Sequence, residues 1–177
     1  MSTQPTAADF ATHVDRPASP HRTICVRPAT PEDAAAIARL ADQLGYPTAP
    51  DDMRGRLTAR MGHPGETVLV AEFPGEREAK PGPAEVVGFV HLFDTPPLVG
   101  NPRTVEIGGL VVDADSRSGG IGASLLRAAE DWAARHGGDI VRVRSNVVRT
   151  DAHRFYERHG YATVKRQVVF ERRISPV

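Results

Sequence analysis

The sequence predicts a single domain of the mixed α/β class, in which helices flank a central mixed sheet. Three observations lead to this prediction. The 177 residues suffice for one domain with a substantial core. Short apolar runs typical of strands are separated by segments whose apolar residues recur every three or four positions, as on one face of a helix. The predicted elements follow the order β-α-α-β-β-β-α-β-α-β-β, which interleaves helices with strands.

The predicted elements begin after an N-terminal segment, residues 1–21, that is rich in Thr, Ala, Ser and Pro. Because such a composition buries little apolar surface, we expect a disordered tail here and a folded domain over residues 22–177. A first strand is predicted at 23–27. A helix follows from the capping sequence at 30–33, where Pro31 occupies the first helical position.

The remaining elements are placed by the two periodicities of regular structure, two residues for a strand and 3.6 for a helix. In order, they are a helix that starts at Asp51 or Asp52, strands at 66–73, 86–93 and 104–112, a helix at about 120–136, a strand at 139–145, a helix at about 151–159, and one or two final strands within 161–174. Residues 74–83 contain three Pro and two Gly and are expected to form an exposed hairpin loop.

Charge and composition argue against several classes of function. Lys plus Arg and Asp plus Glu both number 22, so the formal net charge is zero and nothing indicates a nucleic-acid or membrane-surface partner. No apolar run approaches the roughly 18 residues that would span a bilayer. The seven histidines show none of the familiar metal-ligand spacings, so no metal is expected. The single cysteine, Cys25, cannot form an internal disulfide, which favours a cytoplasmic setting.

The most informative segment is Arg117–Gly122, which reads Arg-Ser-Gly-Gly-Ile-Gly and lies between the strand at 104–112 and the helix at 120–136. Glycines let the backbone approach a ligand closely, and the helix start offers unpaired N–H groups and the positive end of its dipole, so the segment suits a phosphate. Two common motifs do not fit. Leu125 replaces the third glycine of the dinucleotide fingerprint, and no Lys follows Gly122 as in a Walker A loop. A loop that only turns the chain is the alternative interpretation.

The pattern Arg-x-x-Gly-x-Gly at Arg117, Gly120 and Gly122 resembles the signature of the GNAT superfamily, the acyl-CoA-dependent N-acetyltransferases. A second block, Ala-x-x-Phe-Tyr-x-x-x-Gly-Tyr over residues 152–161, is similar to the other characteristic segment of that family. The resemblance covers residues 106 to about 171. It implies a GNAT-like fold, with a mixed, mostly antiparallel sheet whose fourth and fifth strands splay apart between flanking helices.

The resemblance also implies that acetyl-CoA, without any metal, binds along the strands at 104–112 and 139–145. Its pyrophosphate would lie on the glycine-rich loop and its pantetheine arm along the strand backbone. The residues assigned to the cofactor are Leu110, Val111, Val112, Arg117, Ser118, Gly119, Gly120, Ile121, Gly122, Ala123, Asn146 and Phe155. Strand pairing is expected to break near Gly108-Gly109, because glycine within a strand marks a bulge or a close approach. A turn residue is the alternative interpretation of Asn146, and a solvated loop charge that of Arg117.

Acyl transfer to an amine needs an uncharged nucleophile, a path for its proton and an acid for the leaving thiolate. Glu106 is the candidate base, because a charge in an apolar strand is costly unless it is paired or used, and because its offset from Arg117 resembles that of the glutamate base of some family members. A salt-bridged or edge-facing glutamate is the alternative.

Tyr156 is the candidate acid, since a phenol with a pKa of about 10 is protonated at neutral pH. Its alternative is a packed aromatic. Arg142 and Arg144 share one strand face and are expected to face solvent.

The sequence therefore predicts an N-acetyltransferase that moves an acetyl group from acetyl-CoA to a primary amine by direct attack on the thioester. The acceptor would be an unidentified small molecule or peptide. A catalytically silent acyl-CoA-binding sensor or scaffold module is the second hypothesis, and an unrelated α/β nucleotide binder is the third. The family resemblance also admits a homodimer.

Overall fold

A computed structural model describes residues 23–73, 84–96, 98 and 102–174, and these residues contain one five-stranded sheet. Its strands lie side by side in chain order: β1 (Cys25–Pro28), β2 (Glu66–Phe73), β3 (Glu85–Thr95), β4 (Thr104–Val112) and β5 (Ile140–Val143). The first four strands pair antiparallel, whereas β4 and β5 pair in parallel. The sheet is therefore mixed and mostly antiparallel, as predicted. The expected tail at 1–21 and hairpin loop at 74–83 lie outside the described residues.

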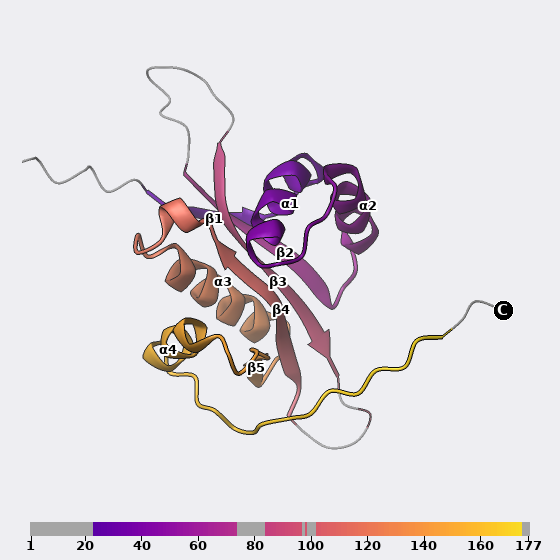
Figure 1. Ribbon diagram of the computed structural model, residues 1–177, viewed down its shortest axis with the longest axis vertical. Helices are drawn as coiled ribbons and strands as arrows, with labels where there is room; N and C mark the ends of the chain where they lie inside the picture. The colour runs from indigo at the N-terminus through magenta and orange to yellow at the C-terminus, as the bar shows by residue number, and fades with distance from the viewer. Residues whose placement is uncertain (1–22, 74–83, 97, 99–101, 175–177) are drawn as a thin grey trace, which may run out of the picture.

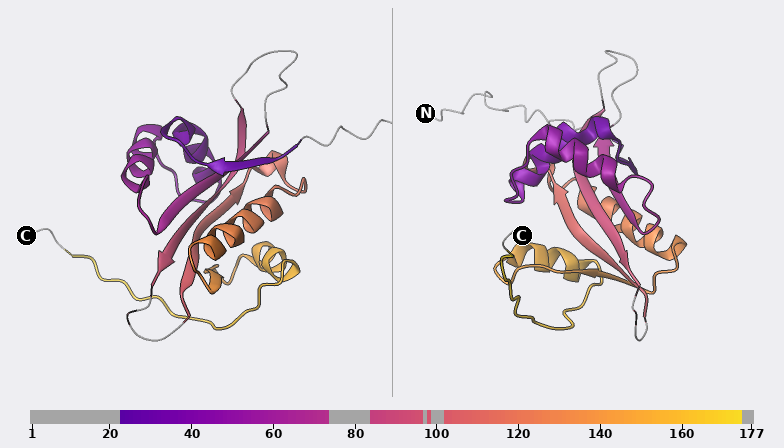
Figure 2. Two further views of the ribbon diagram at one scale, coloured as in Figure 1. Left: turned by 180° about the vertical axis from the view of Figure 1, so that it is seen from behind. Right: turned by 90° about the vertical axis from the view of Figure 1, so that its right-hand side faces the viewer.

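Helices cover both faces of the sheet (Figures 1 and 2). The described α-helices are α1 (Ala34–Gln43), α2 (Pro50–Arg60), α3 (Ile121–Arg135) and α4 (Thr150–Arg158). Two one-turn 3₁₀ helices are also present, η1 (Pro31–Asp33) before α1 and η2 (Ala114–Ser116) after β4. Helices α1 and α2 lie on one face, and α3 lies on the other with α4 beside β5. This arrangement leaves the lower part of the α1 face of the sheet without a covering helix (Figure 1).

Two apolar cores hold these layers together, one on each face of the sheet. On β2, Leu69 and Ala71 belong to the core under α3, whereas Val70 between them belongs to the core under α1 and α2. This alternation is what a strand with both faces covered requires. On α3, the predicted face is buried, with Ile121 and Leu125 at most 1% exposed.

The start of α1 follows the predicted capping sequence. The Thr30 N–H donates a hydrogen bond to Asp33 Oδ2 at 2.8 Å. Arg27 on β1 donates to the same carboxylate oxygen at 2.7 Å, and its Nε donates to Glu72 on β2 at 2.9 Å. A cap thus becomes a link between the helix and the first two strands.

The prediction of final strands within 161–174 is wrong. The chain from Tyr161 to Ile174 has no regular secondary structure, and every residue of 162–174 is exposed. The segment has the alternating apolar pattern of a strand, but a strand also needs a neighbouring edge to pair with. In the structure it runs away from the sheet, past the lower ends of the strands (Figure 1).

Gly88 on β3 marks the closest approach of α3 to the sheet, so it provides a test of the packing. A Cβ atom at Gly88 would lie 2.8 Å from the carbonyl oxygen of Val111 and 3.0 Å from Leu125 Cδ1. We expect Gly88→Ala to lower the free energy of unfolding by about 1–3 kcal/mol, because an added methyl group in a packed interior forces the backbone to shift.

Gly55 in α2 is the matched control, since nothing lies within 4 Å of its Cβ position. Gly55→Ala should raise the free energy of unfolding by about 0.5–1 kcal/mol, because alanine is the better helix former. Thermal or denaturant unfolding of both variants measures the difference. Equal stabilities would contradict the packing described for β3 and α3.

Candidate functional site

The sheet opens between β4 and β5. Their parallel pairing runs from Thr104 opposite Ile140 to Ile107 opposite Val143 and stops there, while β4 continues to Val112 in partnership with β3. From Gly108 onward, the backbone N–H and C=O groups on the β5 side of β4 therefore have no strand partner among the described residues. The predicted splaying of these two strands is present.

A bulge at Gly108 marks the point of divergence. Leu92 of β3 pairs with Ile107 and His91 pairs with Gly109, so Gly108 is left over in the register. A Cβ atom at Gly108 would stand 2.8 Å from His91 Nδ1, and only glycine avoids that contact. The expected break near Gly108-Gly109 is thus a bulge that re-aims the rest of β4.

The loop after β4 is braced against α1. The Asp113 carboxylate forms an ion pair with Arg39 of α1 and accepts a hydrogen bond from the Asp115 N–H at 3.1 Å. The Ala114 N–H donates to Gln43 Oε1, also on α1, at 3.0 Å. The hydrogen bond from Arg39 is the main reason that the pKa of Asp113 lies below its usual value. The loop therefore starts from a fixed point.

The glycine-rich segment then enters α3 with its backbone exposed. Ser118 and Gly120 have φ angles of 70° and 80°, in the left-handed region. The first helical hydrogen bond runs from the Ser124 N–H to the Gly120 carbonyl at 3.0 Å, and no side chain caps the helix start. The N–H groups of Ile121, Gly122 and Ala123 are left without a helical acceptor. This 15-residue helix thus presents free N–H groups and a positive dipole end where the predicted phosphate site lies.

The three glycines of the loop have different roles. Nothing lies within 4 Å of the Cβ position of Gly120, so glycine is needed there for its left-handed φ angle and not for space. A Cβ atom at Gly122 would lie 3.1 Å from Phe155 Cε2, so this glycine lets α4 pack closely on the start of α3. At Gly119 a Cβ atom would meet only the Ser116 carbonyl, at an ordinary 3.6 Å. A substitution at Gly119 can therefore add a side chain to the loop without straining its backbone.

We expect Gly119→Glu to weaken coenzyme A binding by at least tenfold, because a carboxylate would share the helix start with the phosphates. Gly119→Gln is the control, since it adds nearly the same volume without the charge and should lose much less affinity. Isothermal titration calorimetry with coenzyme A measures both variants. If the two bind equally well, the loop does not hold the pyrophosphate.

The other assigned loop and strand residues divide into accessible and packed groups. Arg117 is exposed and forms no ion pair with any described residue, and Ser118 and Ala123 lie beside the open helix start. Val111 is buried in the core under α1, so only its backbone can reach a ligand. Leu110 and Val112 are half-buried and pack on the opposite core.

Asn146 is a turn residue in this structure. Its Oδ1 accepts a hydrogen bond from the Val148 N–H at 3.2 Å, and its carbonyl oxygen accepts from the Arg149 N–H at 2.9 Å. His153 Nε2 bonds the same carbonyl oxygen at 3.1 Å. These contacts agree with the turn interpretation, and they shape the entry into α4.

Tyr156 lies on α4 among other rings. Its ring centroid is 5.3 Å from that of Phe155 and 5.7 Å from that of Tyr161. Burial raises the pKa of the Tyr156 phenol above its ordinary value, and Arg149 counteracts part of that effect. No described residue hydrogen-bonds the Tyr156 hydroxyl. The structure thus keeps this hydroxyl protonated and free to donate to a ligand.

Arg149 connects α4 with the bulge of β4. Its Nη2 donates to the Leu44 carbonyl oxygen, at the end of α1, at 2.8 Å. The side chain of Leu44 in turn lies 4.0 Å from the Cβ position of Gly109. Since Arg149 also acts electrostatically on Tyr156, the start of α4, the end of α1 and the bulge meet around the opening between β4 and β5.

Glu106 is buried on the face of the sheet that α1 and α2 leave open, at 4% exposure. Its Oε1 lies 3.0 Å from Arg144 Nη1. Arg144 is exposed, as expected, but its side chain also reaches back to Glu106, a contact that the sequence did not indicate. The ion pair is compatible with Glu106 as a base and with Glu106 as a salt-bridged glutamate. Arg144 compensates the buried charge through Oε1, and it does not occupy both carboxylate oxygens.

Sequence reasoning missed His91. Its Nε2 is 2.7 Å from Glu66 Oε1 on β2, and that oxygen also forms an ion pair with Arg60 Nε at 2.7 Å. Its other ring nitrogen faces the Gly108 bulge. His91 is therefore held between the Glu66 carboxylate and the bulge of β4. No spacing in the sequence signals this contact, because it depends on the register of three strands.

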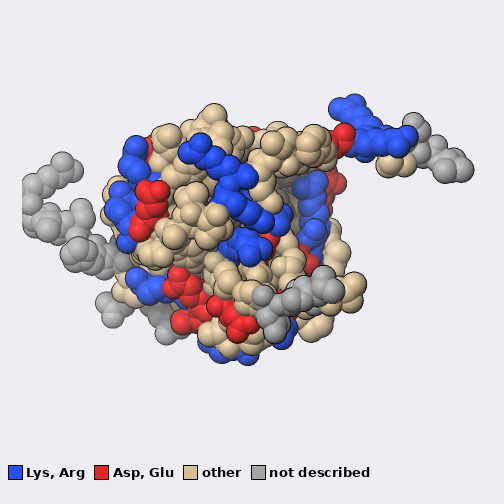
Figure 3. Space-filling model, turned by 90° about the horizontal axis from the view of Figure 1, so that it is seen from below, with Lys and Arg blue, Asp and Glu red and all other residues tan. Residues whose placement is uncertain are grey.

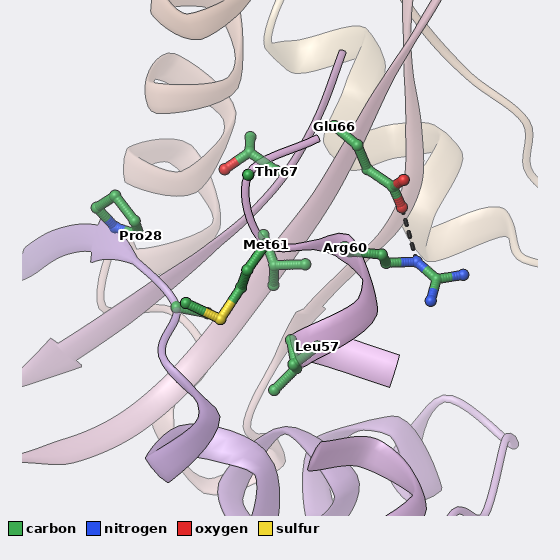
Figure 4. A pocket seen from close by; sticks show the side chains of 9 residues that line it. Pro28, Leu57, Arg60, Met61, Glu66 and Thr67 are labelled. Atoms are coloured by element: carbon green, nitrogen blue, oxygen red, sulfur yellow. Dashed lines mark ion pairs between the residues drawn. The ribbon is translucent and has the colours of Figure 1, made fainter. Parts of the chain in front are cut away.

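The cavity in Figure 4 lies elsewhere, between α2 and β2. It has a volume of about 170 Å³, and its lining includes Leu57, Met61 and the Arg60–Glu66 ion pair. None of the residues assigned to the cofactor lines it. In the described part of the chain, no group of three or more His, Cys, Asp or Glu side chains could hold a metal, and no helix is long and apolar enough to cross a membrane.

Comparison with known proteins places these features in context. Residues 34–161 match the model of the acetyltransferase (GNAT) family. The uncharacterized N-acetyltransferase YhfO of Bacillus subtilis is 31% identical over 140 residues, which are 77% of this chain and 88% of that protein. An aminoalkylphosphonate N-acetyltransferase of Salmonella typhimurium is 40% identical over 77 residues, 44% of this chain and 50% of that protein.

Solved structures share the fold. The aminoglycoside N-acetyltransferase AAC(6')-Iy in complex with CoA superposes with a TM-score of 0.73 at 15% identity, over 86% of this chain and 96% of that one. The BH1408 protein of Bacillus halodurans gives a TM-score of 0.66 at 25% identity, over 83% of this chain and 99% of that one. The arrangement of the described strands and helices is thus found in a solved acetyltransferase that has CoA bound.

Proposed function

Since the chain belongs to the GNAT family of acetyltransferases, we propose that it transfers the acetyl group of acetyl-CoA to a primary amine of a small molecule or peptide. The observation that carries this proposal is the opening of the sheet at Gly108. It leaves a strip of unpaired backbone on β4 that leads to the uncapped start of α3. Such a strip suits the amide-bearing pantetheine arm, and the helix start suits the pyrophosphate.

In the proposed reaction, the amine nitrogen attacks the thioester carbonyl carbon directly. A C–N bond forms and the C–S bond breaks, so the amine loses one proton and the coenzyme A thiolate gains one. We assign to the Tyr156 hydroxyl, which burial keeps protonated, the role of donating a proton to the thiolate. We assign to Glu106 the role of accepting the proton of the amine, directly or through water, with His91 as the rival acceptor on the same face of the sheet.

The acceptor would approach over the open face that carries Glu106 and His91. The relatives indicate the kinds of amine to try, because one bears the name of an aminoalkylphosphonate acetyltransferase and another that of an aminoglycoside acetyltransferase. We further propose that the protein acts in the cytoplasm, as expected from its single cysteine.

An amine panel tests this function. Aminoalkylphosphonates, aminoglycosides, amino acids, polyamines and peptide N-termini are incubated with the protein and acetyl-CoA, and the products are identified by mass spectrometry while free thiol is measured. We expect at least one amine to be acetylated in equal amount to the thiol released. A silent acyl-CoA-binding module would bind coenzyme A by calorimetry and acetylate none of them.

A further inference from the structure

Four neighbouring strands each place one residue in a single row across the sheet. Glu66 of β2 is the register partner of Phe93 of β3, and Phe93 is in turn the partner of Glu106 of β4. Glu106 is the partner of Arg142 of β5. Residues directly opposite each other on paired strands point to the same face of the sheet. The row therefore leads from β2 through the candidate base and ends at an arginine.

Arg142 faces the side of the sheet on which Glu106 lies. Its neighbours Val141 and Val143 pack against the core under α3, so the alternation of the strand turns Arg142 to the opposite face. That face has no covering helix in its lower part (Figure 1). When the molecule is seen from below, Lys and Arg side chains gather near the middle of this end (Figure 3). Arg142 thus lies on the face over which the acceptor would approach.

The two carboxylates of the row already have cationic partners. Glu66 pairs with Arg60 at 2.7 Å, and Glu106 pairs with Arg144 at 3.0 Å. Arg142, by contrast, is half-buried and forms no ion pair or hydrogen bond with any described residue. Withdrawing a guanidinium partly from water without an anionic partner is unfavourable, and an anionic group on a ligand would offset that cost.

The pyrophosphate of coenzyme A does not account for this cation. Its proposed site begins beyond the end of β4 at Val112, whereas Arg142 stands opposite Glu106, near the start of that strand. At about 3.3 Å per residue, the two levels of the sheet are roughly 15–20 Å apart. The ligand group that would meet Arg142 therefore belongs to the acceptor.

We propose that Arg142 selects an acceptor amine that also carries a carboxylate or phosphonate group. This inference rests on the proposed function, because it concerns the second charged group of the amine from which Glu106 would take a proton. Neighbouring strands are about 4.8 Å apart, so an amine with its anionic group two carbons from the nitrogen fits between the two side chains. A guanidinium binds either anionic group through two parallel hydrogen bonds. Arg142 is thus a specificity-determining residue.

Calorimetry on the protein saturated with coenzyme A tests the proposal with three short amines. β-Alanine carries a carboxylate, 2-aminoethylphosphonate carries a phosphonate, and β-alaninamide has the shape of β-alanine without its negative charge. We expect at least one anionic amine to bind the wild-type protein about tenfold or more tightly than β-alaninamide, and the tighter of the two identifies the group that Arg142 prefers. Equal affinities for the three amines, or no detectable binding of either anionic amine, would overturn the proposal.

Substitutions at Arg142 assign the preference to this side chain. Arg142→Gln should abolish it and leave the affinities for β-alaninamide and coenzyme A unchanged, whereas Arg142→Lys retains the charge and should keep part of it. Arg135→Gln is the matched control, because it removes an exposed arginine from the end of α3, on the other face of the sheet, and it should bind all three amines as the wild-type protein does. A preference that persists in Arg142→Gln, or that is lost equally in Arg135→Gln, would overturn the proposal.

Acetylation of the same amines separates this inference from the proposed function. If the anionic amines bind through Arg142 and none of the three is acetylated, acetyl transfer to such amines is overturned and the anion site stands. If β-alaninamide is acetylated with the same kcat/KM as β-alanine and 2-aminoethylphosphonate, acetyl transfer stands and the selection by Arg142 is overturned.

Discussion

Replacing Tyr156 with phenylalanine is expected to lower kcat by about a hundredfold or more and to leave KM and coenzyme A affinity nearly unchanged. The ring and its packing against Phe155 remain, and only the hydroxyl is lost. If that hydroxyl protonates the departing thiolate, its loss is felt in the transition state alone. Steady-state kinetics with an acceptor found in the amine panel provide the measurement.

Tyr161→Phe is the matched control for this prediction. It removes a neighbouring phenol whose hydroxyl is already engaged with Glu130, and it should leave kcat close to the wild-type value. If both variants retain full kcat, Tyr156 is only a packed aromatic. A raised KM with intact kcat would instead make Tyr156 a residue that binds the ground state.

The pH dependence of the wild-type rate follows from the same residue. Burial raises the pKa of Tyr156, so the hydroxyl stays protonated in the folded protein below its usual pKa of about 10. The acid is lost only as the pH rises through the elevated pKa. The loss of kcat due to Tyr156 should therefore begin above about pH 10, and a loss near pH 8 that disappears in Tyr156→Phe would contradict this.

Glu106→Gln is expected to lower turnover by about a hundredfold near neutral pH, while coenzyme A affinity stays the same. The amide has the shape of the carboxylate but cannot accept the amine proton. Arg144→Gln is the control, because it keeps the carboxylate and removes its 3.0 Å partner. If Glu106 is the base, Arg144→Gln should keep most of the activity.

Two other outcomes would assign Glu106 differently. Equal losses of stability and activity in Glu106→Gln and Arg144→Gln would make the ion pair structural, since each variant removes one partner of the same pair. If Glu106→Gln turns over normally and His91→Gln does not, the proton acceptor is the histidine held by Glu66.

The frame of the site could be predicted because it depends on local pattern. The strand at 104–112 and the helix from Ile121 have strong periodicity, and the glycines between them signal a special backbone. The separate roles of Gly120 and Gly122 could not be predicted. One is set by a φ angle, and the other by a contact with Phe155 more than 30 residues away.

The contacts that sequence reasoning missed or misjudged all depend on strand register. The reach of Arg144 to Glu106 follows from the parallel pairing of β5 with β4, and the contact of His91 with Glu66 follows from the antiparallel pairing of β3 with β2. The prediction of final strands within 161–174 was wrong for a related reason. Apolar residues alternate there as in a strand, but the pattern does not show whether a strand edge is available to pair with them.

A crystal structure with bound coenzyme A tests the proposed cleft most directly. The pantetheine amides should hydrogen-bond the β4 backbone between Gly108 and Val112, and the pyrophosphate should accept hydrogen bonds from the N–H groups at the start of α3. The thiol should lie within reach of the Tyr156 hydroxyl. Density for the cofactor in the cavity between α2 and β2, or along β4 with its phosphates away from residues 117–123, would contradict the proposed site.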